Sequence, residues 1–93
     1  MEGNLNFIVD GDYYVSDTLT GGYNGCVAYQ LNFEEADAIV IVEYSVFPEM
    51  GWTAASRAKA GLSYPDVVSG ALDGINVRIR TTHRPAEAKY KTI

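Results

Sequence analysis

The chain has 93 residues, of which 47% are hydrophobic, and a net charge of −5 at pH 7. This hydrophobic content excludes a disordered tail, and the length fits one domain, so we expect a single domain over residues 1–93. No apolar run approaches the roughly 18–20 residues needed to cross a bilayer, and no signal peptide is apparent. The negative net charge argues against general binding of nucleic acid.

Charge is distributed unevenly along the chain. Nine acidic residues and no basic residue precede Arg57, whereas seven basic and three acidic residues lie from Arg57 onward. The two parts therefore carry charges of −9 and +4. In one interpretation the parts interleave in a sheet and their charges pair across strands. In the other, an acidic face and a basic face favour contacts between copies of the chain.

The first third of the sequence predicts strands separated by turns. Residues 5–9 form an apolar strand that ends at the turn 10–12, and residues 13–15 begin a second strand. Glycines and Asn24 break the chain over residues 20–25. Residues 26–33 alternate in polarity, and we expect the apolar set to face the core: Val27, Tyr29, Leu31 and Phe33.

The middle of the chain holds its most apolar strand and one ambiguous segment. Residues 38–46 are apolar on both faces, which predicts a central strand covered on both sides. Thr53–Ala60 has helical composition, and Gly61 follows as a possible C-cap. An eight-residue helix is only marginally stable alone, so we favour a strand or irregular structure there and keep a short helix in 53–60 as the alternative.

The last third again reads as strands. Residues 64–68 form a short strand or turn that Pro65 excludes from a central position. Residues 76–82 and 87–93 alternate cleanly. Seven or eight short strands at this spacing predict an all-β fold, a small antiparallel β-sandwich of jelly-roll or immunoglobulin-like topology, with a small barrel as the alternative.

Few residues suit catalysis or metal binding. His83 and Cys26 are the single histidine and cysteine, too few for a closed zinc site, and nothing indicates an activated thiol. Asp10, Asp12 and Asp17 lack the regular spacing of a calcium loop. We therefore expect no catalytic residue, metal or cofactor, and a protein that is not an enzyme. A lone cysteine fits a reducing compartment or assembly inside a cell.

Aromatic and basic residues supply the candidates for a protein interface. Tyr13, Tyr14 and Tyr23 lie near predicted turns, and Trp52 follows a loop, whereas Tyr29, Tyr44 and Tyr90 are expected to face the core. If residues 76–82 and 87–93 pair as a hairpin, four basic side chains project from one face: Arg78, Arg80, Lys89 and Lys91. Such a stripe is a solvated sheet face or a docking surface for an acidic protein patch.

Residues 39–45, the segment 51–54 and the closing strand 74–82 resemble small β-sandwich domains of tailed-bacteriophage virion proteins. These are capsid decoration (cement) proteins and fibre or tail accessory domains. The similar part spans residues 26–93, and the small-residue segment Thr53–Ala60 departs from the pattern. The resemblance implies a structural role, often as a symmetric trimer bound to a larger shell, and brings no catalytic residues.

The hypothesis from the sequence is a bacteriophage capsid decoration protein. It predicts a homo-oligomer, with a trimer favoured, on a major capsid or tail protein of a virion assembled in the host cytoplasm. One alternative is a small phage inhibitor or adaptor of a host protein, whose acidic first part mimics nucleic acid. The other is a carbohydrate-binding module that uses Trp52 and the turn tyrosines. No membrane or nucleic-acid partner is expected.

Overall fold

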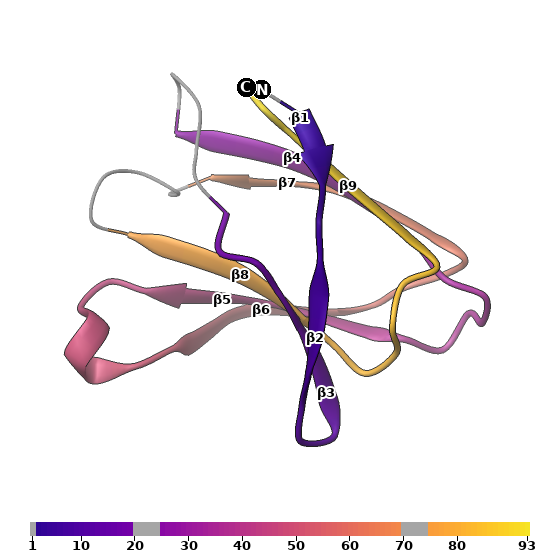
Figure 1. The fold of residues 1–93 in the computed structure, drawn as a ribbon, viewed down its shortest axis with the longest axis horizontal. Coiled ribbons are helices and arrows are strands. Elements are labelled where there is room, and N and C mark those ends of the chain that lie inside the picture. Colours follow the sequence, from indigo (N-terminus) through magenta and orange to yellow (C-terminus); the bar gives the residue numbers. More distant parts are fainter. Residues whose placement is uncertain (1, 20–24, 70–74) are drawn as a thin grey trace.

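A computed structural model shows two antiparallel sheets packed face to face, and describes residues 2–19, 25–69 and 75–93 (Figure 1). The four-stranded sheet has the order β1 (Glu2–Asn4), β9 (Glu87–Thr92), β4 (Cys26–Asn32), β7 (Ser63–Ser69). The five-stranded sheet has the order β2 (Phe7–Asp10), β3 (Tyr13–Ser16), β8 (Asn76–Thr81), β5 (Ile39–Ser45), β6 (Thr53–Lys59). The predicted all-β sandwich is confirmed.

The strand order is that of a jelly roll. Early strands pair with late ones as if the chain were one long hairpin rolled into a sandwich: β1 with β9, β3 with β8, β4 with β7, and β5 with β6. This nesting gives the two Greek keys of a jelly roll, whereas immunoglobulin sheets follow a different order. The topology thus decides between the two alternatives that alternation of polarity left open.

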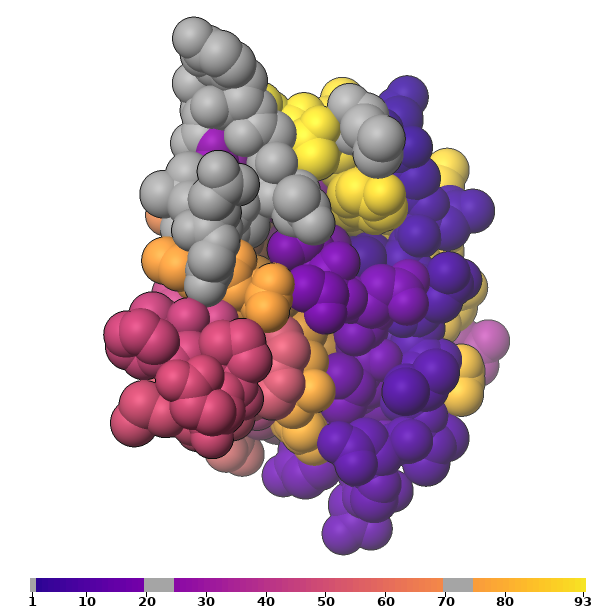
Figure 2. Space-filling view, turned by 60° about the vertical axis from the view of Figure 1, so that its left-hand side comes forward, coloured from indigo at the N-terminus to yellow at the C-terminus, as the bar shows by residue number. Residues whose placement is uncertain are grey.

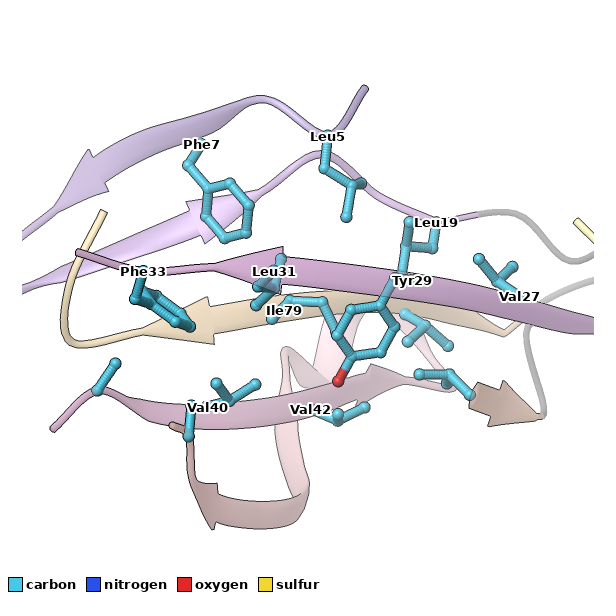
Figure 3. Close-up of a cluster of buried hydrophobic side chains, with 14 residues drawn as sticks. Leu5, Phe7, Leu19, Val27, Tyr29, Leu31, Phe33, Val40, Val42 and Ile79 are labelled. Carbon is cyan, nitrogen blue, oxygen red and sulfur yellow. The ribbon is translucent and has the colours of Figure 1, made fainter. Parts of the chain in front are cut away.

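The core lies between the sheets and contains the residues that alternation predicted. Val27, Tyr29, Leu31 and Phe33 are all buried, and they face Val40, Val42, Val77 and Ile79 of the other sheet (Figure 3). Fully burying one such side chain stabilises the fold by about 1.5–3 kcal/mol. Tyr44 and Tyr90 are partly buried and pack against this cluster.

Strand β5 is central in its sheet, as predicted, since it pairs with both β8 and β6. Val40 and Val42 point into the core. Ile41 points to the outer face and is still only 7% exposed. Its partners in the register are Arg57 and Arg80, whose long side chains flank it on either side.

Two sequence expectations need correction. The alternative of a short helix in 53–60 is wrong, because Thr53–Lys59 pairs with β5, with one register shift at Val42/Glu43, and so gains a cooperative ladder that an isolated helix lacks. The strand expected over residues 5–9 begins only at Phe7, because the chain passes from one sheet to the other at residues 5–6 and buries Leu5 on the way. Pro65 lies on the edge strand β7, as expected. Of the chain break expected over residues 20–25, all but Gly25 lies outside the described residues.

Candidate protein-binding face

The outer face of the five-stranded sheet gathers four of the predicted interface residues. On β8, Val77 and Ile79 are fully buried, so alternation turns Arg78 and Arg80 outward. Opposite Arg78 in the register lies Glu43 of β5. We call this surface the Trp52 face and define it by six residues: Asp10, Tyr13, Glu43, Trp52, Arg78 and Arg80.

Glu43 holds both arginines of the Trp52 face. Its Oε1 accepts hydrogen bonds from Arg78 Nε at 2.8 Å and from Arg80 Nε at 3.2 Å. The three side chains are only 12%, 20% and 18% exposed, respectively. Arg80 Nη2 also donates to Asp10 Oδ2 at 3.0 Å. Charge-assisted bonds of this kind are about twice as strong as neutral ones, so the arginines are held in fixed positions.

Burial by itself lowers the pKa of the Arg80 guanidinium. The hydrogen bonds and negative charges of Glu43, and then of Asp10, outweigh burial and raise this pKa above its ordinary value. Arg80 therefore stays charged at neutral and at alkaline pH. The face combines fixed positive charge with a carboxylate that compensates it.

Aromatic rings flank the charged row at both ends. The Arg78 guanidinium carbon lies 4.1 Å from the centroid of the Trp52 ring, and that of Arg80 lies 5.3 Å from the Tyr13 ring. Both distances fall within the range of cation–π attraction. The result is an ordered array that runs from Trp52 through Arg78, Glu43 and Arg80 to Tyr13.

The β5–β6 loop adds exposed apolar side chains next to this array. Phe47 is 57% and Met50 is 78% exposed. A short 3₁₀ turn, Pro48–Met50, holds them in place, with Gly51 at φ +78° donating its N–H to the Pro48 carbonyl at 3.2 Å. The loop leads directly into Trp52. In Figure 2 the same segment, drawn in rose, forms a protruding lobe of the molecule.

Sequence reasoning treated residues 47–51 as a loop and did not count Phe47 or Met50 as interface candidates. The available signal was the presence of two large apolar residues in a short turn that also contains proline and glycine. Val46, Phe47 and Met50 are exposed within five residues of one another, and a group of exposed apolar side chains indicates an interaction site where a single one does not.

The remaining candidates do not join the Trp52 face. Tyr14 packs partly buried against the core, with the Arg84 guanidinium carbon 5.0 Å from its ring. Tyr23 lies outside the described residues. Lys89 and Lys91 point outward from the four-stranded sheet, on the other side of the sandwich, because Ala88 and Tyr90 pack inward.

The basic stripe predicted from a hairpin is therefore wrong. Strands β8 and β9 belong to different sheets, so Arg78 and Arg80 point away from Lys89 and Lys91. The connection between them crosses the sandwich: Thr82 N–H bonds to Ile39 on one sheet, and Ala86 N–H bonds to Asn32 on the other. Alternation fixed the direction of each pair relative to its own strand, but not the sheet to which that strand belongs.

The four-stranded sheet carries a hollow of about 590 Å³. Its lining includes Ala28, Pro65, Val67, Lys89 and Lys91. Neither lysine forms an ion pair with a described carboxylate. The lining of this hollow also includes Glu2 and Asp66, so it carries both charges, and it lacks the fixed contacts of the Trp52 face.

The residues weighed for chemistry lie apart from one another. His83 Nε2 is 3.7 Å from a Glu35 carboxylate oxygen, and its Nδ1 is 2.9 Å from the Thr82 hydroxyl. Cys26 begins β4. In the parts of the chain that the structure describes, no three His, Cys, Asp or Glu residues are placed to hold a metal ion. None of the described segments forms a helix long and apolar enough to cross a membrane.

No protein-family model, curated protein or solved structure matches this chain. The fold therefore defines its class, a small antiparallel jelly-roll β-sandwich, and the Trp52 face with the adjoining β5–β6 loop is its most organised surface.

Proposed function

We propose that the protein is a structural accessory protein that binds a larger protein assembly, in the manner of a bacteriophage capsid decoration protein. It docks through the Trp52 face and the β5–β6 loop. The observation that carries the proposal is an ordered Trp–Arg–Glu–Arg–Tyr array that is joined in the chain, at Trp52, to a loop that exposes Phe47 and Met50. The jelly-roll sandwich and the resemblance to phage virion domains support the particular role.

The composition of this surface is the one that protein interfaces favour. Trp, Tyr, Phe, Met and Arg are enriched at interface cores, and Trp, Tyr and Arg dominate binding energy. Because Glu43 and Trp52 already hold Arg78, docking costs little additional side-chain entropy there. The apolar area of Phe47 and Met50 would contribute about 25 cal/mol for each Å² that a partner covers. Repetition over many copies on a shell multiplies such contributions.

The two alternatives have less support. A sugar ring stacks on the face of an aromatic side chain, but the Arg78 guanidinium already lies 4.1 Å from the centroid of Trp52. An acidic mimic of nucleic acid needs free carboxylates, but Asp10 is paired with Arg80 at 3.0 Å. We retain the homo-oligomer, with a trimer expected, as part of the proposal.

The test uses shells and tails of the virus that encodes the chain, assembled without it. Purified protein should cosediment with one of them at a fixed number of copies per particle, and light scattering should give three times the monomer mass. The double variant Phe47→Ser with Met50→Ser should bind about a hundredfold more weakly, since two exposed apolar anchors are lost.

Leu62→Ser is the matched control. Leu62 is 59% exposed, close to Phe47, but it lies in the β6–β7 connection at the other end of β6. This variant should bind like wild type. The proposal fails if wild type binds neither shells nor tails, or if the double variant binds as tightly as the Leu62 control.

A further inference from the structure

The two sheets have four edge strands, and three of them carry a device that discourages pairing with another strand. Strand β1 has only three residues, and β7 contains Pro65. In β2 the Phe7 carbonyl already accepts a hydrogen bond from Arg84 Nη1 at 3.0 Å. Strand shortness, proline and covered backbone groups are the usual ways of protecting an edge.

Strand β6 lacks these three devices, although a bulge shifts its register with β5 between Val42 and Glu43 and leaves residues 56–59 as the regular part of the edge. It has seven residues, contains no proline, and pairs only with β5 within the described chain. Most of its side chains are small and exposed: Thr53, Ala54, Ala55 and Ser56. Small side chains leave the backbone accessible, so this edge can accept an added strand.

The hydrogen-bond pattern shows which backbone groups of β6 are available. The Ile39 carbonyl accepts a hydrogen bond from the N–H of Thr82, which follows β8, on the side of β5 opposite β6. The Ala60 N–H donates to the Ala38 carbonyl. Antiparallel ladders alternate between hydrogen-bonded and non-bonded pairs, so the pairs Ile39–Lys59 and Ile41–Arg57 are non-bonded. The N–H and C=O groups of Arg57 and Lys59 therefore point away from β5, toward the open edge.

Charge at this edge selects the partner. Arg57 and Lys59 place two positive charges at the C-terminal end of β6. Arg57 forms no ion pair with a described carboxylate, and Lys59 has only an exposed contact of 3.6 Å with Asp37. Two copies meeting edge to edge through antiparallel β6 strands would place Arg57 and Lys59 of each copy beside the uncharged residues 53–55 of the other, so self-pairing gives these cations no acidic partner. An acidic strand is attracted by the same charges.

The other end of β6 is apolar, since the strand begins directly after Trp52 and the loop that carries Phe47 and Met50. All strand pairs among the described residues are antiparallel, and antiparallel pairing is the slightly more stable arrangement. An added antiparallel strand would place its N-terminal half beside Arg57 and Lys59 and its C-terminal half beside the apolar loop.

We propose that β6 binds, by strand addition, an extended segment of a partner protein that is acidic in its N-terminal half and apolar in its C-terminal half. The inference rests on the proposed function for the source of that segment, a protein of the larger assembly. It adds the mode of binding and the chemistry of the segment.

The test needs no shell. The probe is a peptide of seven residues, the length of β6. In its N-terminal half glutamate alternates with valine, and its C-terminal half consists of valine and threonine. Saturating peptide should slow hydrogen exchange of the Arg57 and Lys59 amides by about tenfold or more, because both become bonded. A peptide with lysine in place of glutamate should bind about tenfold more weakly, as expected for reversed charge.

Two variants separate charge from strand pairing. Arg57→Pro removes an N–H that points to the open edge, at an edge position where proline is tolerated, whereas Arg57→Gln removes only the charge. The proline variant should bind the peptide at least about tenfold more weakly than the glutamine variant, since a backbone bond is lost. Retained cooperative unfolding of both variants shows that the fold is intact.

Equal peptide binding by the two variants would overturn the inference, as would peptide-induced protection at β2 or β7 instead of β6. Protection of Arg57 and Lys59 that grows with protein concentration in the absence of peptide would identify a second copy as the occupant and also overturn it. Loss of shell binding in the Phe47 and Met50 double variant with normal binding by Arg57→Pro would refute the inference alone. Failure of wild type to bind any shell, with normal peptide binding, would refute the proposed function alone.

Discussion

The two outer faces of the sandwich carry the same pattern, two basic residues separated by one apolar residue, yet they differ in organisation. Arg78 and Arg80 share Glu43 and lie beside aromatic rings. Lys89 and Lys91 instead have Asn4, Gln30, Glu2 and Ala28 as their neighbours in the register, and no described ion pair.

This difference depends on the neighbouring strand and on the type of cation. Strand β8 lies beside β5, which supplies the largely buried carboxylate of Glu43 opposite Arg78, whereas β1 supplies only the exposed Glu2 opposite Lys91. A planar guanidinium can bond to the Glu43 carboxylate and stack on a ring at once, whereas an ammonium is compact and strongly hydrated. The side chains of the Trp52 face therefore hold one another in place, whereas Lys89 and Lys91 form a solvated surface, the lysine face.

The largest expected effect comes from removing the shared carboxylate. Glu43→Ala leaves two largely buried guanidinium groups with fewer partners and should lower the free energy of unfolding by about 2–3 kcal/mol, below the full cost of a buried pair because the site is partly solvated. Urea unfolding measures it. Glu87→Ala on the other sheet, where the exposed carboxylate bonds only to Asn32 Nδ2 at 3.0 Å, should cost less than about 1 kcal/mol. Equal losses would contradict the comparison.

The second expected effect concerns alkaline pH and the inner side of the four-stranded sheet. Burial, then the nearby charge of Asp66, raises the pKa of Tyr29, whose hydroxyl donates to Asp66 Oδ2 at 3.3 Å. Burial and Asp66 also raise the pKa of Tyr64. In the unfolded chain tyrosine loses its proton near pH 10.

The folded state therefore keeps a proton that the unfolded state releases above about pH 10, so stability is complete below that pH and falls as pH rises. The loss should approach about 1 kcal/mol per pH unit for Tyr29. Tyr29→Phe should flatten this decline in unfolding experiments between pH 9 and 11. Glu43→Ala, which alters only the opposite face, should retain it; an unchanged decline in Tyr29→Phe would refute the assignment.

A double-mutant cycle measures the third effect, the contact between Trp52 and Arg78. The variants Trp52→Leu and Arg78→Gln and their combination should give a coupling free energy of about 0.5–1 kcal/mol, as for a partly desolvated cation–π pair. The same cycle for Asn4 and Lys89, partners in the register of the solvated face, should give no measurable coupling. A coupling free energy of zero between Trp52 and Arg78 would show that their contact does not stabilise the fold.

The smallest effects should come from the lysine face. Lys89→Ala and Lys91→Ala should each change the free energy of unfolding by no more than about 0.5 kcal/mol, because both side chains are exposed. Thermal unfolding at low salt would detect a larger value. A loss comparable to that of Glu43→Ala would show that the lysines form contacts as strong as those of the arginines.

Much of the fold followed from local pattern. Alternation over residues 26–33 and 76–82 predicted the inward side chains, because a strand turns successive residues to opposite faces whatever lies beside it. Pro65 indicated an edge strand for the similarly local reason that it lacks an N–H. Of the eight interface candidates, the structure brings together Tyr13, Trp52, Arg78 and Arg80 on one face.

The sequence by itself determined the all-β class, the core-facing residues and the outward direction of each basic pair, since these depend on period-two alternation within single strands. Only the tertiary structure decided the jelly-roll order, the separation of β8 from β9, and the meeting of Glu43 with Arg78 and Arg80. It also decided that Thr53–Lys59 is an open edge. These features depend on which distant strands pair, and pairing is governed by burial and hydrogen bonding over the whole sandwich rather than by the residues of one segment.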